Sequence, residues 1–115
     1  DEPAMTYAEM ISPTGLAAVA GYADVVGADM RLVIGGDGKP TALVGDARKA
    51  GLDIHPWTLR KGNAFLPTIL RLPGGEGARG CMETLFSMLA DAGVTGVFTD
   101  DPALAVAARA GKICP

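Results

Sequence analysis

Apolar and polar residues follow one another along this chain in blocks that predict helices and strands in turn. Apolar residues first recur at spacings of three and four, the stripe of an amphipathic helix, at Leu16, Val19, Ala20 and Ala23. Ser12 and Pro13 precede this stripe and suit the N-cap and the first position of a helix. Residues 24–27 then predict a very short buried strand.

A second block of the same kind follows. Pro40 opens a predicted helix that Gly51 ends, and its inner stripe consists of Leu43, Val44 and Ala47. Residues 52–55 predict the second strand. The glycine-rich segment 35–38 before this helix is expected to be a plain turn, because no Lys-Ser/Thr pair follows it at the spacing of a phosphate-binding loop.

The third block lies beyond a long connection, residues 58–80. A connection of this length in a compact domain is usually functional or disordered. The third predicted helix ends at Gly93, and its apolar face consists of Met82, Leu85, Phe86 and Leu89. Residues 94–99 predict a third strand, and Asp100, Asp101 and Pro102 start a last helix that runs through Ala110. This alternation predicts an α/β fold whose strands are parallel.

Composition narrows the class of protein. The chain has 115 residues, enough for one domain, and a net charge of −3. Its ten Lys and Arg residues are scattered, so nucleic acid is not an expected partner. No apolar run approaches the roughly 20 residues of a membrane span. Neither an initiator Met nor a leader segment is present, and we expect the chain to be a fragment. Cys81 and Cys114 either form a disulfide or remain two small separate thiols.

Chemically informative residues cluster where the predicted strands end. In parallel α/β folds, ligands bind beyond the carboxyl ends of the strands. The second strand ends in His55, Trp57, Thr58 and Arg60, and the third ends in a segment with two carboxylates, residues 99–101. This pattern predicts a pocket that has one apolar wall and charged groups at its edge.

A series of short motifs, in order and at consistent spacing, resembles the C-terminal part of glycerophosphodiester phosphodiesterases, and most closely the bacterial periplasmic type. The motifs are Tyr7-Ala8-Glu9, Ile11-Ser12-Pro13, Tyr22-Ala23-Asp24, Gly51-Leu52, His55-Pro56-Trp57-Thr58 with Arg60, Asn63-x-Phe65-Leu66-Pro67, and Ala92-Gly93-Val94 running to Thr99-Asp100 with Pro102. The series spans nearly the whole chain.

The resemblance implies a fold and a reaction. The family fold is a TIM (β/α)8 barrel, of which residues 1–115 would be a C-terminal fragment with roughly the last three βα units. These enzymes hydrolyse glycerophosphodiesters to glycerol 3-phosphate and an alcohol with the help of Ca²⁺ or Mg²⁺. The family's catalytic histidines and metal-binding carboxylates precede this region. We therefore expect no catalytic residue, no metal ligand, no bound cation and no activity in the isolated chain.

The resemblance also implies roles for single residues. Trp57 would pack against the glycerol moiety of the substrate, or else cover the mouth of the barrel. Arg60 and Lys61 would attract the anionic phosphodiester or remain solvated. Phe98 is the third expected substrate contact besides Trp57 and Arg60, although Phe98 and Thr99 alternate across their strand and only one faces the barrel interior.

Two other residues are expected to be structural. His55 would fill the barrel interior or hold a neighbouring loop by a hydrogen bond, and Asp100 would orient its loop or cap the last helix. Two departures from the family pattern leave the released alcohol open: Asp101 replaces an aromatic residue, and Gly62 replaces a Glu in the segment after Trp57.

The cellular location and the oligomeric state of the protein are also matters of expectation. The resemblance favours a periplasmic or secreted protein, with a cytoplasmic one as the alternative. A different class of function also remains open: a non-catalytic binding or structural module, in which a partial barrel forms a homo-oligomer through its open sheet edges.

Overall fold

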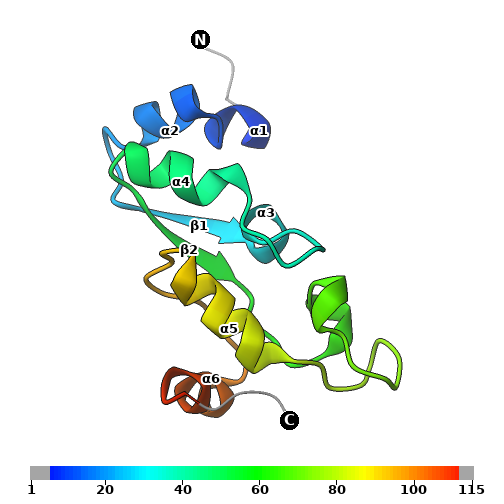
Figure 1. The fold of residues 1–115 in the computed structure, drawn as a ribbon. Helices are drawn as coiled ribbons and strands as arrows, with labels where there is room; N and C mark the ends of the chain where they lie inside the picture. The colour runs from blue at the N-terminus through cyan, green and yellow to red at the C-terminus, as the bar shows by residue number, and fades with distance from the viewer. Residues whose placement is uncertain (1–5, 112–115) are drawn as a thin grey trace.

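The computed structural model describes residues 6–111 and has a mixed α/β fold (Figure 1). Two short parallel strands lie between two groups of helices. The strands are β1 (Val25–Asp29) and β2 (Asp53–Trp57). The α-helices are α1 (Tyr7–Met10), α2 (Pro13–Val19), α3 (Met30–Val33), α4 (Ala42–Lys49), α5 (Met82–Asp91) and α6 (Pro102–Arg109). Two 3₁₀ turns, η1 (Asn63–Phe65) and η2 (Thr68–Leu70), lie between β2 and α5.

The sheet has one covered side. In β2, Ile54 and Pro56 are buried, while the odd-numbered residues between and beside them are partly or fully exposed. The register places Val25 opposite Asp53 and Asp29 opposite Trp57, so odd-numbered residues of both strands share the open side. The prediction of a buried first strand is wrong in this respect. Val25 is 40% exposed, and the buried residues of the two strands, Ala28, Ile54 and Pro56, all lie on the other side of the sheet.

The third strand is not formed as predicted. Residues 94–98 have no regular strand structure, and Thr99 makes only an isolated parallel bridge to Leu59. Two backbone hydrogen bonds join this segment to the end of β2, from Phe98 N to Pro56 O (3.1 Å) and from Leu59 N to Phe98 O (2.8 Å). Asp53 N donates a hydrogen bond to Asp24 O beside β1 (3.0 Å). Because N–H groups alternate between the two edges of a strand, those of even-numbered residues in β2 face the other edge, next to residues 94–99. Pro56 has no N–H, so β2 lacks one of the hydrogen-bond donors with which a third strand at residues 94–99 would pair.

The predicted helix starts and ends are mostly confirmed. Ser12 caps α2, because its hydroxyl accepts a hydrogen bond from Gly15 N (3.1 Å), and Pro13 is the first helical residue. Gly51 and Gly93 follow α4 and α5 with φ of 82° and 96°, the left-handed conformation that ends a helix without the steric cost of a Cβ. α4 begins at Ala42, two residues after Pro40.

The predicted inner faces of these helices form the core. The core joins residues of both strands and of the helices, and its fully buried side chains include Leu16, Leu52, Leu59, Met82, Leu85 and Leu89. α2 packs against α4, α4 against β2, and α5 against α6. α5 has ten residues, and no helix within residues 6–111 is long and apolar enough to cross a membrane. Of the two cysteines for which the sequence predicts either a disulfide or separate thiols, Cys114 lies outside the described residues.

The long connection between β2 and α5 is ordered by one buried side chain. Asn63 is almost completely buried, and its Nδ2 donates hydrogen bonds to Leu72 O (2.6 Å) and Gly75 O (2.8 Å). Its Oδ1 accepts a hydrogen bond from Leu72 N (2.9 Å). The Asn63 backbone N–H also donates to Ala78 O (2.8 Å). These bonds satisfy the Asn63 amide and fold residues 72–78 back onto the start of the connection.

Candidate functional site

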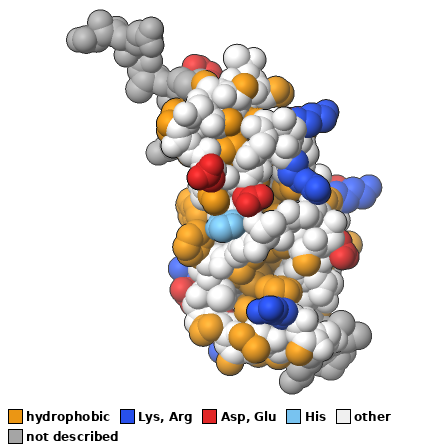
Figure 2. Space-filling model, turned by 90° about the vertical axis from the view of Figure 1, so that its left-hand side faces the viewer, with side chains coloured by type: hydrophobic (Ala, Val, Ile, Leu, Met, Phe, Trp, Pro, Cys, Tyr) orange, Lys and Arg blue, Asp and Glu red, His pale blue; other side chains and the backbone are white. Residues whose placement is uncertain are grey.

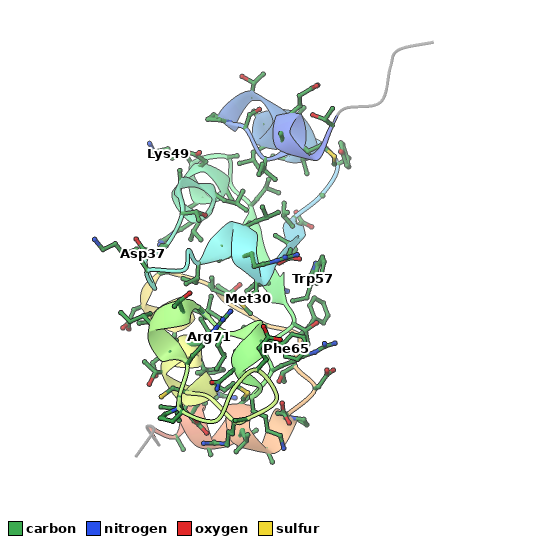
Figure 3. All side chains as sticks on the ribbon, turned by 90° about the vertical axis from the view of Figure 1, so that its right-hand side faces the viewer. Met30, Asp37, Lys49, Trp57, Phe65 and Arg71 are labelled. Carbon is green, nitrogen blue, oxygen red and sulfur yellow. The ribbon has the colours of Figure 1, made fainter. Side chains whose placement is uncertain are left out.

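A cavity of about 530 Å³ opens at the carboxyl ends of β1 and β2, the position that the sequence predicts (Figure 3). Three segments line it: residues 29–36 after β1, residues 57–60 at the end of β2, and residues 64–71 of the long connection. The third segment reaches the first because Ile69 N donates a hydrogen bond to Gly36 O (3.4 Å). The volume is in the range of pockets that hold small molecules.

One wall of the cavity is aromatic. Trp57, the only Trp of the chain, is 44% exposed and lies on the open side of the sheet. The ring extends toward Gly27, which lies on the same side of the sheet two residues before Asp29, and a Cβ added at Gly27 would lie 3.9 Å from the ring. The side chain of Phe65 also lines the cavity, and the guanidinium carbon of Arg60 lies 4.7 Å from the Phe65 ring centroid. This distance is typical of a cation–π contact.

Two of the three arginines that line the cavity have carboxylate partners. Arg31 Nε and Nη2 donate to the two oxygens of Asp29 (3.1 and 2.9 Å), and Arg31 N donates to the first of these oxygens as well (2.9 Å). The hydrogen bonds from the Arg31 side chain lower the pKa of the Asp29 carboxyl, and Asp29 in return raises the pKa of Arg31. Arg60 Nε lies 2.6 Å from Asp100 Oδ2. Both partners of this second pair are substantially exposed, so it contributes little to stability.

The third arginine, Arg71, is different. Its Nε donates to Leu66 O (3.2 Å), and no carboxylate of residues 6–111 forms an ion pair with it. Thr58 and Thr68 also line the cavity and add hydroxyl groups. The charge of the cavity lining is therefore positive, and its hydrogen-bonding groups are mainly donors.

His55 lies outside the cavity lining. Its Nε2 is 3.2 Å from the Thr95 hydroxyl, and a Cβ at Gly96 would lie only 3.0 Å from the same nitrogen. The histidine thus contacts the segment that follows α5, in agreement with the expected role of holding a neighbouring loop. Figure 2, in which the histidine is pale blue, shows it partly exposed, with acidic and hydrophobic side chains around it.

The structure brings together two of the three predicted substrate contacts. Trp57 and Arg60 both line the cavity, whereas Phe98 is 57% exposed and does not. Lys61 does not line this cavity and contacts Asp101. The Asp101 carboxylate accepts a hydrogen bond from Lys61 N (3.2 Å), and one of its oxygens lies 3.8 Å from Lys61 Nζ. Asp101 occupies the N-cap position of α6, as predicted, but its carboxylate makes no side-chain capping bond.

Sequence reasoning missed the contributions of Phe65 and Arg71. Both lie in the connection between β2 and α5, whose path depends on hydrogen bonds between residues distant in sequence. The one available signal was the length of the connection and its position after the strand that ends in Trp57.

The described residues do not fit a site for a hard divalent cation. Ca²⁺ and Mg²⁺ require several oxygen ligands that converge on one point. Within residues 6–111, no three side chains of His, Cys, Asp or Glu gather in such a cluster. Asp29 is the one carboxylate in the cavity lining, and Arg31 occupies both of its oxygens.

Comparison with protein families agrees with the motif series in the sequence. Residues 2–104 of the 115 match the model of the glycerophosphoryl diester phosphodiesterase family. The match includes both strands, the whole cavity lining and the start of α6. The chain therefore belongs to the glycerophosphoryl diester phosphodiesterase family.

Proposed function

We propose that this chain is the C-terminal part of a phosphodiesterase barrel that hydrolyses glycerophosphodiesters to glycerol 3-phosphate and an alcohol, and that it provides the wall against which the glycerol moiety packs. The observation that carries the proposal is the cavity at the strand ends, with Trp57 on one wall and a positive lining, in a chain of this family. A flat apolar ring suits the carbon-bound hydrogens of a polyol, and the arginines attract an anionic phosphodiester.

The open side of the sheet supports a partial barrel. Odd-numbered residues of β1 and β2 share this side, and Val25 and Trp57 on it are both exposed. The order of helices and strands, with parallel pairing of β1 and β2, agrees with consecutive βα units. In a whole barrel, further strands would cover the open side and pair with the outer edge of β1.

In this proposal, the groups that hydrolyse the phosphodiester bond belong to a part of the enzyme outside the described residues. The family's reaction uses a divalent cation and acid–base groups, and residues 6–111 have no cluster that fits the cation. Their single histidine is occupied with Thr95 outside the cavity. This chain would contribute binding: Trp57 orients the polyol, and Arg60 and Arg71 hold anionic ligand in the cavity.

An activity assay tests this division of labour. We expect the purified 115-residue chain to release no glycerol 3-phosphate from glycerophosphocholine in the presence of Ca²⁺ or Mg²⁺. The protein encoded by the complete reading frame should have a larger mass than this chain and should contain a His-Arg-Gly segment upstream of it. That longer protein should hydrolyse the same substrate. Metal-dependent turnover by the 115-residue chain, or a reading frame that begins at its own first residue, contradicts the proposal.

A second candidate function, self-association, is favoured by the outer edge of β1. β1 pairs with one strand only within the described residues, and exposed strand edges tend to pair with another chain. We expect the isolated chain to elute above its monomer mass of 11.7 kDa in size-exclusion chromatography with light scattering. A monomer at all concentrations up to the solubility limit contradicts association through the sheet edge.

A further inference from the structure

We propose that Arg71 is a specificity-determining residue of the cavity: it recognises an oxyanion on the ligand, so that the cavity prefers a phosphorylated polyol to a neutral polyol or to a ligand that carries a quaternary ammonium group. The proposal rests on the proposed function for the identity of the ligand, a glycerol phosphoryl compound. Its physical basis lies in the charges and contacts of the cavity lining.

The first step is the charge balance of the cavity. Arg31 is neutralised by two hydrogen bonds between its side chain and Asp29, and Arg60 lies against Asp100. No carboxylate of the described residues pairs with Arg71. Of the three arginines in the lining, Arg71 thus presents the charge that a ligand would have to balance.

The second step is the orientation of the guanidinium. Arg71 Nε donates to Leu66 O at 3.2 Å, and Leu66 is buried, with its N–H bonded to Asn63 O (3.1 Å). This contact fixes one edge of the guanidinium against the protein. The terminal nitrogens of an arginine held in this way form a planar fork, which matches two oxygens of a phosphate or carboxylate.

The third step is the arrangement around the cavity. Figure 3 shows Trp57 and Arg71 on opposite sides of Met30, so the aromatic wall and the cationic group are separate features of one cavity. A phosphorylated polyol has complementary parts, since its carbon-bound hydrogens suit Trp57 and its oxyanion suits Arg71. Thr58 and Thr68 provide further hydroxyl groups for such a ligand.

The same arrangement disfavours a quaternary ammonium group. Such a cation gains from the face of an aromatic ring, but Arg60 already lies over the Phe65 ring, 4.7 Å from its centroid. A cationic ligand in the cavity would also be repelled by the unbalanced charge of Arg71. We therefore expect a choline ester to bind more weakly than a polyol phosphate of similar size.

Trp57 allows a direct binding test with the chain as it exists. It is the chain's only Trp and lines the cavity, so its fluorescence reports ligand there. The chain is titrated at low ionic strength with glycerol, glycerol 3-phosphate, glycerate and glycerophosphocholine. We expect glycerol 3-phosphate to bind at least about tenfold more tightly than glycerol, as a charge-assisted hydrogen bond provides. Glycerate tests a carboxylate as the alternative oxyanion, and stronger binding of the phosphate identifies the phosphoryl group.

Three variants test the role of Arg71. Arg71→Gln should remove the preference for glycerol 3-phosphate over glycerol, whereas Arg109→Gln, the same change on the exposed surface of α6, should keep it. Arg71→Lys retains a charge without the planar fork and should give an intermediate preference. If circular dichroism shows that Arg71→Gln is unfolded, the Arg71→Lys result decides.

The proposal is overturned if Arg71→Gln and Arg71→Lys keep the wild-type preference, if Arg109→Gln loses it equally, or if the wild-type chain binds none of the ligands. Tighter binding of glycerophosphocholine than of glycerol 3-phosphate also overturns it. These outcomes are distinct from a failure of the proposed function, because the titration measures binding by the isolated chain and the activity assay measures turnover by the longer polypeptide.

Discussion

Asn63→Ala should lower the free energy of unfolding by about 3 kcal/mol and release the connection between β2 and α5. The change removes three hydrogen bonds of a buried side chain, to Leu72 O, Gly75 O and Leu72 N. Each contributes roughly 0.5–1.5 kcal/mol, and the backbone groups left without partners add to the loss. Urea unfolding followed by circular dichroism measures the free energy, and limited proteolysis should show new cleavage at residues 72–78.

Two further variants sharpen this test. Glu76→Ala alters an exposed residue of the same connection and should cost less than about 0.5 kcal/mol. If Asn63→Ala costs no more than this control, the amide does not order the connection. Asn63→Asp keeps one acceptor but places a carboxylate against two carbonyl oxygens, which raises the pKa of that carboxyl in the folded state. Its cost should be smallest below about pH 3.9, the unfolded value, and should grow as pH rises through the folded value.

Leu85→Ala should cost about 2–5 kcal/mol of stability, a large share of the total for a chain of this size. Leu85 is 0% exposed and lies on the inner face of α5, in the core that joins the strands to the helices. Truncation removes three buried carbon atoms and leaves a cavity that the surrounding helices fill only in part. Thermal and urea unfolding, with Trp57 fluorescence as a second probe, give the loss.

Val106→Ala is the matched control for this truncation. Val106 is on α6 and 67% exposed, so the loss of its methyl groups should change stability by less than about 0.5 kcal/mol. Equal effects of the two substitutions would mean that α5 does not pack in the core as described. Non-coincident transitions by circular dichroism and fluorescence would show instead that the two helical groups unfold separately.

Elements with local signals could be predicted from the sequence. The start of α2 follows from Ser12 and Pro13, whose capping and backbone preferences act within one helical turn. The ends of α4 and α5 follow from Gly51 and Gly93, which adopt the left-handed conformation. The buried faces of both helices follow from apolar periodicity alone.

The prediction of a third strand was wrong because strand formation depends on pairing with the adjacent strand, β2. Residues 94–99 have the apolar composition of a strand, but the adjacent edge of β2 contains Pro56, which lacks a donor. The four-residue helix α3 (Met30–Val33) was missed because it is too short to show a periodic stripe. Its start depends on the side chain of Asp29, which accepts a hydrogen bond from Arg31 N.

The candidate site divides in the same way. Trp57 and Arg60 could be predicted because they lie at and just beyond the end of β2, and parallel strands place ligands at their carboxyl ends. Phe65 and Arg71 could not, since their positions depend on the buried amide of Asn63 and on the contact between Ile69 and Gly36. Local patterns do not encode such long-range hydrogen bonds.

Because buried and exposed residues alternate along β2, the side chain beside the cavity changes when the chain before β2 is lengthened or shortened by one residue. Ile54 and Pro56 are buried, while Asp53 and Trp57 lie on the other side of the strand. Insertion or deletion of one residue between Gly51 and Ile54 would exchange these sides if the strand kept its place in the sheet. The indole would then enter the core, and its place beside the cavity would be taken by Pro56 after an insertion or by Thr58 after a deletion. A change of two residues would keep the indole on the open side of the sheet, although displaced along the strand, whereas a change of one residue would not.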